Sequence, residues 1–275
     1  MNTNGLLAII GGTGVHLRDN TLLSNVRDEV VETRWGRAQL SRATYENRAI
    51  VFLQRHAASS LDDNKIAGQA IPPHRVNYRA NIAALKKIGV TAIFASTAVG
   101  SLKIEYSPGT LVLLDDFFDA TTCRAKTFFD DRAVHIDMTE PYCARLRSLL
   151  QLTANDFGFT IEPRGTYVCT DGPRFETPSE IRAYAKLGDV VGMTGVPEVV
   201  LAREANISYA SVSIVTNLAA GISPSPLTQA EVLDAMKVSL PQLLQLFLAA
   251  AREYTDDLSV ATRRATEEFG SPDVF

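Results

Sequence analysis

The 275-residue sequence has few cysteines and histidines, and neither type is grouped. Cys123, Cys143 and Cys169 include no C-x-x-C pair. An odd number of scattered cysteines is typical of reduced thiols in a cytosolic protein rather than of a disulfide framework. The 4 histidines lack the helical spacing of zinc ligands. We therefore expect a cytoplasmic protein without disulfides and without a bound metal.

Long hydrophobic runs and an excess of positive charge are missing as well. No apolar run approaches the roughly 18 residues that span a bilayer, and the first residues lack the basic start and apolar core of a signal peptide. The formal net charge of -4 argues against nucleic acid or a membrane as the main partner. The composition, 46% hydrophobic and 21% charged, is that of a globular protein, and no linker divides it. We expect one domain over residues 1–275, with a charged peripheral tail over about 253–275 that forms a surface helix or frays.

Short apolar runs alternate with amphipathic segments along the chain. Predicted buried strands cover residues 6–10, 92–97, 110–114, 166–169 and 209–216, and a hairpin covers 38–53. Predicted helices cover residues 76–88, 146–152, 177–188 and 196–205, and a long one runs from 228 toward 251. This alternation predicts an α/β fold. We expect a mixed, mostly parallel central β-sheet flanked by helices on both faces.

Polar clusters follow several of these strands. They are Gly11–Gly14, Arg55 with His56, Ser96–Ala98, Met193–Gly195, and Thr216 with Asn217. In open α/β sheets ligands bind beyond the carboxyl ends of the strands, and hydroxyls, a guanidinium and backbone N–H groups suit a phosphate. Each cluster alone is weak, because glycine turns and surface arginines are common. The residues by themselves indicate an α/β enzyme with an anion site and leave the substrate open.

Seven stretches, in the same order, resemble the trimeric purine nucleoside phosphorylase family, which includes the methylthioadenosine and methylthioinosine phosphorylases. They are Ile10–Gly14, Gln54–His56, Pro73–Asn81, His135–Tyr142, Gly172–Thr177, Gly192–Glu198 and Thr216–Ser223. The likeness extends from about Leu7 to about Ala250. It implies a nucleoside phosphorylase-like fold and a homotrimer with sites at subunit interfaces, or a hexamer of paired trimers. It also implies no metal or organic cofactor, inorganic phosphate being a co-substrate.

The resemblance further implies which residues take part in cleavage of the N-glycosidic bond. Breaking the C1′–N9 bond leaves positive charge on the sugar and negative charge on the purine. Bound phosphate stabilises the first and attacks C1′, while a donor to N7 stabilises the second, an effect worth roughly 10²–10³ in rate. The catalytic residues are then Asn217 as the N7 donor, with His56 and Arg55. The phosphate contacts are Thr13, Arg55, His56, Thr97, Ala98 and Thr194.

The base and sugar residues come from the same resemblance. Phe175 would pack on the base, Met193 would lie along the sugar, and a neighbouring subunit would lend His135 to the 5′ end. Glu176 and Asn217 would read the purine edge. A carboxylate accepts from N1–H of a 6-oxopurine but faces the N1 lone pair of adenine. The adenine-specific members of the family carry Ser and Asp at these two positions, so we expect a 6-oxopurine.

The 5′ substituent stays open. Gln229 stands where the family's ordinary inosine and guanosine enzymes tend to have His and its methylthio enzymes an apolar residue. The stretches His135–Tyr142 and Pro73–Asn81 resemble the methylthio branch more closely. Gln69 replaces a His of that branch after a longer segment, 57–68, so no contact from this loop is carried over. Inosine, guanosine and 5′-methylthioinosine all fit.

Three alternatives are weighed against this hypothesis. A methylthioadenosine phosphorylase would need Glu176 protonated or turned away from the base. A nucleoside sensor without catalysis would have no need of the phosphate residues. A nicotinamide-dependent oxidoreductase would need a third glycine where Leu17 stands.

Overall fold

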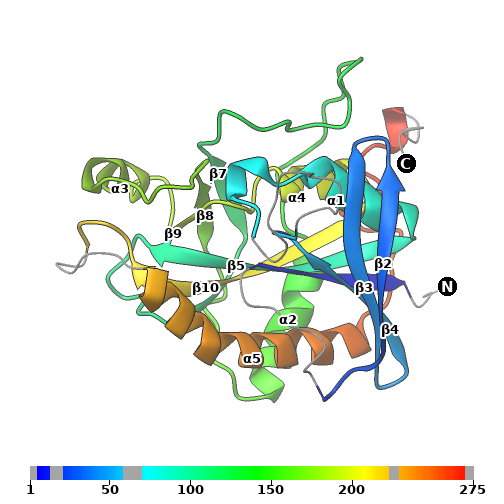
Figure 1. The fold of residues 1–275 in the computed structure, drawn as a ribbon, viewed down its shortest axis with the longest axis horizontal. Helices are drawn as coiled ribbons and strands as arrows, with labels where there is room; N and C mark the ends of the chain where they lie inside the picture. The colour runs from blue at the N-terminus through cyan, green and yellow to red at the C-terminus, as the bar shows by residue number, and fades with distance from the viewer. Residues whose placement is uncertain (1–4, 13–20, 58–69, 223–228, 270–275) are drawn as a thin grey trace.

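The computed structural model describes residues 5–12, 21–57, 70–222 and 229–269; of the side chains, those of residues 229–231 and 233 lie outside the description. Within these ranges one mixed sheet runs in the order β2-β3-β4-β1-β5-β9-β8-β7, with β10 beside β5 and β6 beside β10 (Figure 1). The strands are β1 Leu6–Gly11, β2 Ser24–Thr33, β3 Gly36–Tyr45, β4 Arg48–Gln54, β5 Val90–Ser101, β6 Leu111–Leu113, β7 Asp116–Asp119, β8 Thr166–Cys169, β9 Val190–Gly192 and β10 Ser208–Leu218.

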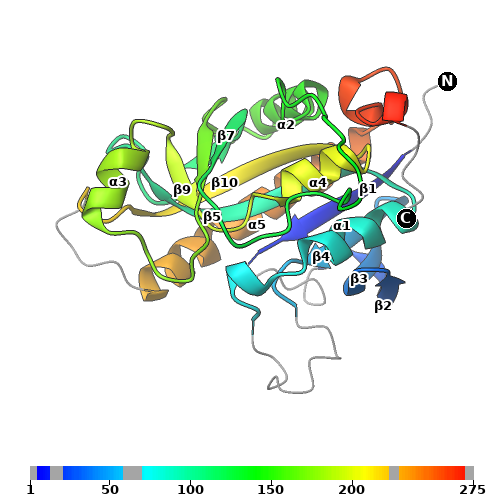
Figure 2. The ribbon, with the colours of Figure 1, turned by 90° about the horizontal axis from the view of Figure 1, so that it is seen from above.

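Helices cover both faces of this sheet. The α-helices are α1 Tyr78–Lys87, α2 Ala144–Asp156, α3 Pro178–Tyr184, α4 Glu198–Glu204 and α5 Gln229–Glu253, and the 3₁₀ turns are η1 Pro73–Arg75, η2 Ala261–Arg263 and η3 Glu267–Phe269. Helices α1 and α4 share one core cluster, α2 and α5 share a second, and Ile181 of α3 belongs to a smaller third one (Figure 1). Figure 2 shows α3 at the end of the molecule opposite the red 3₁₀ turns η2 and η3. The expected α/β fold with a mixed sheet is confirmed.

Strand β1 lies at the centre of the sheet and feeds both cores. It pairs in parallel with β4 and with β5, and β5 pairs in parallel with β10. Ala8 and Ile10 point into the α1/α4 core, whereas Leu7 and Ile9 point into the α2/α5 core. A strand buried on both faces needs a continuous apolar run, because successive side chains alternate between the faces. The parallel strands β4, β1, β5 and β10 therefore end at one common edge.

Local signals in the sequence place several elements correctly. The hairpin β3–β4 turns at Glu46 and Asn47, which both have positive φ, as a tight hairpin turn requires. Gly89, at φ +87°, follows the end of α1. Thr177 forms a capping box with Glu180 at the start of α3. The capping residue expected at Thr228 lies outside the described residues.

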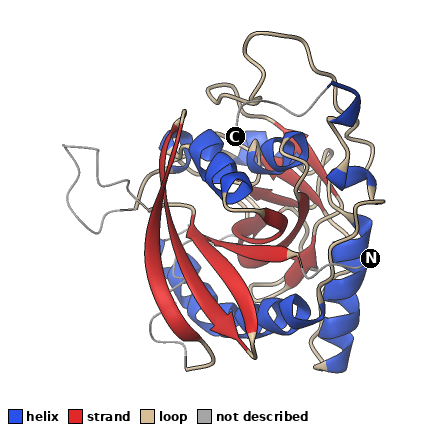
Figure 3. Cartoon of the chain, turned by 90° about the vertical axis from the view of Figure 1, so that its right-hand side faces the viewer, coloured by secondary structure: helices blue, strands red, loops and turns tan. Residues whose placement is uncertain are grey.

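Other boundaries differ from the expectation. Helix α3 ends at Tyr184 rather than at Gly188, because Gly188 packs against β8, where an added Cβ would lie 2.9 Å from the Thr166 carbonyl oxygen. Strand β5 continues past Thr97 to Ser101. The strand β2, which forms one edge of the sheet (Figure 3), is not predicted. Most of its side chains are exposed and many are charged, so its sequence lacks the apolar pattern of a buried strand.

The described chain beyond α5, residues 254–269, packs against the rest of the protein. It is neither the surface helix nor the frayed tail that the sequence predicts. Arg263 forms an ion pair with the buried Asp256 at 2.9 Å. The Asn206 amide donates to the hydroxyl of the fully buried Thr266 at 2.7 Å. These contacts fix residues 254–269 beside the start of β10. No helix in the described ranges is long and apolar enough to cross a membrane.

Candidate active site

A cavity of about 430 Å³ opens at the edge of the sheet where the parallel strands end. Cavities of this size typically hold small molecules in proteins. Its wall comes from the loops after β1 and β4, from β5, β9 and β10, from the loop before α3, and from Val232 of α5. The sequence-predicted residues that line it are Arg55, His56, Ala98, Phe175, Glu176, Met193, Thr194 and Asn217. These predicted residues, which lie up to 162 positions apart in the chain, thus share one cavity.

Four other predicted residues are not seen in this wall. Thr97 is buried, and its hydroxyl is hydrogen-bonded to that of Ser213 at 2.8 Å, so it is engaged within the sheet. His135 is exposed in the loop between β7 and α2, away from the cavity of its own chain. Thr13 lies outside the described residues. The backbone of Gln229 begins α5, but its side chain is outside the description.

Arg55 is held by a buried partner that the sequence did not reveal. Its Nε and one Nη donate to the two carboxylate oxygens of Glu198, each at 2.7 Å, and its other Nη donates to the Ser96 carbonyl at 2.8 Å. Both side chains have no solvent exposure. Burial lowers the pKa of Arg55, but the charge and hydrogen bonds of Glu198 outweigh it and raise the pKa above its ordinary value. The guanidinium is therefore a fixed cation at the cavity wall.

Glu198 completes a small buried network at the start of α4. The Tyr209 hydroxyl, from β10, donates to it at 2.8 Å. Three donors thus surround a carboxylate that would otherwise be costly to bury. In the sequence Glu198 stands only as the last residue of the family stretch Gly192–Glu198, and an acid in the first turn of a helix is ordinarily an exposed residue. Its partner stands 143 positions earlier in the chain.

His56 has a defined tautomer. Its Nδ1 lies 2.7 Å from the Ile71 carbonyl oxygen, and because that oxygen can only accept, Nδ1 carries the proton. Burial lowers the pKa of the ring, an effect that the Ile71 hydrogen bond opposes and the neighbouring Arg55 reinforces. The ring is therefore neutral at pH 7, and Nε2 presents a lone pair.

Tyr167, a residue of β8, positions the segment Gly192–Gly195. The backbone N–H groups of Thr194 and Gly195 donate to the Tyr167 hydroxyl at 3.0 and 3.3 Å. An added Cβ at Gly192 would lie 2.5 Å from this same hydroxyl oxygen, so only glycine fits there. Met193 and Thr194 are thereby held at the cavity wall.

Two side chains of the cavity wall, Glu176 and Asn217, have opposite hydrogen-bonding character. The Thr170 hydroxyl donates to Glu176 Oε1 at 2.7 Å. The Asn217 amide oxygen accepts from the Thr216 hydroxyl at 2.9 Å, and its nitrogen donates to the Leu218 carbonyl at 3.0 Å. These contacts leave one amide hydrogen of Asn217 for a ligand. The site therefore combines an acceptor carboxylate and a donor amide.

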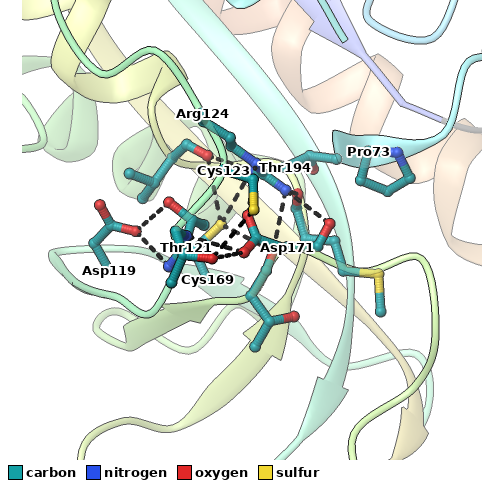
Figure 4. A network of polar contacts seen from close by, with 12 residues as sticks. Pro73, Asp119, Thr121, Cys123, Arg124, Cys169, Asp171 and Thr194 are labelled. Atoms are coloured by element: carbon teal, nitrogen blue, oxygen red, sulfur yellow. Dashed lines mark hydrogen bonds and ion pairs between the residues drawn. The ribbon is translucent and has the colours of Figure 1, made fainter. Parts of the chain in front are cut away.

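A second arginine, Arg124, joins the loop that carries Glu176 to the segment Met193–Val196. Its terminal nitrogens donate to the carbonyl oxygens of Thr170 and Asp171, each at 3.1 Å, of Met193 at 2.6 Å, and of Val196. Figure 4 shows Arg124 and Asp171 at the centre of this network, with Asp119 and Pro73 on opposite sides. No pattern in the sequence singled out Arg124, because carbonyl oxygens from distant loops leave no sequence signal.

The cavity offers hydrogen-bonding and electrostatic chemistry. Arg55, His56 and Thr194 can hold an anion, and Glu176 with Asn217 can read a planar polar edge. Phe175, 43% exposed, adds an apolar surface to the same wall. In the described ranges no cluster of His, Cys, Asp or Glu side chains is suited to a metal ion.

The comparisons with known proteins agree with this geometry. The sequence model of the Phosphorylase superfamily matches residues 6–252. A probable 6-oxopurine nucleoside phosphorylase of Dictyoglomus turgidum is 48% identical over 266 residues, which cover 96% of this chain and 97% of that protein. A probable S-methyl-5'-thioinosine phosphorylase of Methanothermobacter thermautotrophicus is 42% identical over 94% of this chain and 88% of its own length. Among solved structures, the methylthioadenosine phosphorylase of Schistosoma mansoni in complex with adenine has a TM-score of 0.84 at 32% identity, over 96% of each chain.

Proposed function

Because the chain belongs to the Phosphorylase superfamily, we propose that it is a purine nucleoside phosphorylase that acts on 6-oxopurine nucleosides. Such a pentosyltransferase uses inorganic phosphate to split the N-glycosidic bond and releases the free base and a sugar 1-phosphate. One observation carries the proposal: an acceptor carboxylate and a donor amide share a cavity with a buried arginine and a neutral histidine. The names of the relatives support the same activity.

We place phosphate at the end of the cavity formed by Arg55, His56, Ala98 and Thr194. Glu198 neutralises Arg55 overall, so the guanidinium offers its remaining N–H bonds in a fixed direction rather than a large excess of charge. Neutral His56 can accept a hydrogen bond at Nε2 from a protonated phosphate oxygen or a sugar hydroxyl. A phosphate bound in this way keeps much of its own negative charge for the positive charge that develops at C1′.

The purine then lies against Phe175, with Met193 along the sugar. Glu176 Oε1 is occupied by Thr170, and Oε2 accepts from N1–H of a 6-oxopurine. The free amide hydrogen of Asn217 points to N7 and stabilises the charge that collects there as the bond breaks. Adenine would present its N1 lone pair to the same carboxylate, and two acceptors facing each other repel.

Several parts of the site remain proposals that rest on the resemblance. They include the phosphate contacts of Thr13 and Thr97, the role of Gln229 at the 5′ end, and the loan of His135 to a neighbouring subunit of a homotrimer. The exposure of His135 supports the last of these, because its imidazole is open to a second chain. Inorganic phosphate is the co-substrate. The cytoplasmic location stays a prediction.

The activity is tested by release of hypoxanthine from inosine or 5′-methylthioinosine, and of guanine from guanosine, followed by ultraviolet absorbance with and without phosphate. We expect release only with phosphate, together with an equal amount of sugar 1-phosphate. Comparing the three substrates also identifies the 5′ substituent. Release at the same rate without phosphate, or no release from any nucleoside, would rule out the proposed reaction.

A 6-aminopurine activity is the second candidate, and the likeness to a methylthioadenosine phosphorylase solved with adenine supports it. Rates on methylthioadenosine and methylthioinosine separate the two. We expect Asn217→Asp to raise the rate on 6-aminopurines relative to 6-oxopurines, because a carboxyl at this position can accept from the 6-amino group. An unchanged ratio would count against the role given to Asn217.

A further inference from the structure

We infer that Thr170 determines the specificity of this site by fixing Glu176 as a hydrogen-bond acceptor, so that the pocket takes a 6-oxopurine and rejects a 6-aminopurine. The inference rests on the proposed function and adds to it a positioning residue outside the cavity wall. Thr170 follows β8 directly and is 8% exposed. It reaches the ligand only through Glu176.

The backbone and side chain of Thr170 are fully engaged. Its N–H donates to the Gly192 carbonyl at 2.9 Å, and its carbonyl accepts from Arg124 at 3.1 Å. Its hydroxyl donates to Glu176 Oε1 at 2.7 Å. A threonine hydroxyl has a single hydrogen to donate, and here a carboxylate oxygen receives it.

Arg124 makes this arrangement rigid. The side chain of Arg124 is 2% exposed, and it binds Asp171 and Met193 as well as Thr170, so the loop cannot shift without breaking several charge-assisted hydrogen bonds. The guanidinium also lies 5.3 Å from the centroid of the Tyr78 ring. The hydroxyl of Thr170 is therefore held at a fixed point behind Glu176.

The fixed hydroxyl of Thr170 determines which hydrogen bonds Glu176 can form with a base. The hydrogen bond from Thr170 fixes Oε1, so the carboxylate presents Oε2, an acceptor without a hydrogen of its own, to the base. An ionised Glu176 satisfies N1–H of a 6-oxopurine. Adenine presents a lone pair at N1, so it would be accommodated only if the carboxylate turned away, and that movement would break the hydrogen bond from Thr170. Within the described part of the chain, Oε2 accepts no hydrogen bond and is left for the base.

The test compares Thr170→Val with Thr170→Ser. Valine keeps the shape of the side chain and removes the hydroxyl, while serine keeps the hydroxyl. We expect Thr170→Val to lower the ratio of kcat/KM for inosine over adenosine by about tenfold, the usual size of a hydrogen bond to a charged group, with the KM for phosphate unchanged. Thr170→Ser should stay within about twofold of the wild type. Inhibition constants for hypoxanthine and adenine give the same ratio where adenosine is not turned over.

Thr153→Val is the matched control. It also removes a buried threonine hydroxyl, which donates to the Leu149 carbonyl inside α2, far from the cavity, and it should leave the ratio unchanged. General damage to the fold would lower both rates together and would not move the ratio. If Thr170→Val does not fold, Thr170→Ala carries the same expectation.

The results of these experiments distinguish failure of the proposed function from failure of the role given to Thr170. A wild type that shows no phosphate-dependent release overturns the proposed function and this inference with it. A wild type that cleaves inosine, combined with an unchanged ratio in the hydroxyl-free variant or a lost ratio in Thr170→Ser, overturns the role of Thr170 alone.

Discussion

At Glu198 a carboxylate without solvent exposure meets three donors, two from Arg55 and one from Tyr209. The cation that it fixes belongs to the proposed phosphate site, so Glu198 influences phosphate without touching it. Removing one partner of a buried ion pair leaves the other charge without compensation, at a cost of about 3–5 kcal/mol. A bound phosphate would restore part of that compensation.

We therefore expect Glu198→Gln to lower the free energy of unfolding by about 3 kcal/mol and to make the protein more dependent on phosphate. The measurement is the thermal unfolding midpoint with and without excess phosphate. The gain from phosphate should be larger in the variant than in the wild type, because the anion replaces the lost negative charge beside Arg55. Tyr209→Phe, which keeps the ion pair, should show the wild-type gain. Equal gains in all three proteins would contradict a phosphate site at Arg55.

The residues of the site fall into two groups: those that the sequence identifies and those that only the structure identifies. Arg55, His56, Glu176 and Asn217 stand after strands or inside family motifs, and the structure brings them to one cavity. Glu198 and Arg124 act through contacts between segments far apart in the chain, whereas Thr170 acts on Glu176, six positions later. Glu198 ends a family motif, but no pattern in the sequence gives any of these three residues a role. The residues that are proposed to contact the ligand can therefore be found from the sequence. The roles of the residues that hold them in place come only from the structure.

Among the elements, α1 shows how a single capping residue ties a helix to the sheet. The side-chain oxygen of Asn77 accepts a hydrogen bond from the Ala80 N–H at 3.0 Å. The side-chain amide nitrogen of Asn77 donates to the Trp35 carbonyl at 2.7 Å. The cap thus joins α1 to the β2–β3 hairpin. It also fixes the chain that follows the Ile71–Pro73 wall of the cavity.

We expect Asn77→Ala to lower the free energy of unfolding by about 1–2 kcal/mol, because it removes the helix cap and the bond to the hairpin. Urea unfolding measures the change. Asn155→Ala serves as the control: its exposed side chain bonds the neighbouring Gln151 at 3.3 Å, and its loss should stay within about 0.5 kcal/mol of the wild type. Similar losses of unfolding free energy in both variants would show that the cap of α1 stabilises the protein no more than an exposed side-chain hydrogen bond.

Element boundaries were predictable where local chemistry decides them. The turn at Glu46 and Asn47, the capping box at Thr177 and the stop at Gly89 each follow from a residue's own conformational preference. The end of α3 does not, because it depends on the contact of Gly188 with β8. Strand β2 is held by pairing with β3, and its polar sequence gives no sign of that pairing.

For the whole molecule, the alternation of apolar runs and helices predicted the layers, since a buried parallel strand and an amphipathic helix have different periods. The order of the strands did not follow from the sequence. It depends on β10, the last strand in the chain, pairing with β5 near the centre of the sheet. That pairing brings Asn217 to within reach of the loops after β1 and β4, and so makes a single cavity out of distant motifs.

The most direct measurement of this arrangement is a crystal structure of the protein with phosphate and guanine. We predict that the guanine N1–H donates to Glu176 Oε2, that the Asn217 amide faces N7, and that phosphate contacts Arg55, His56 and Thr194 on the opposite side of the space left for the sugar. A base bound away from Glu176, or a phosphate bound away from Arg55, would contradict the account.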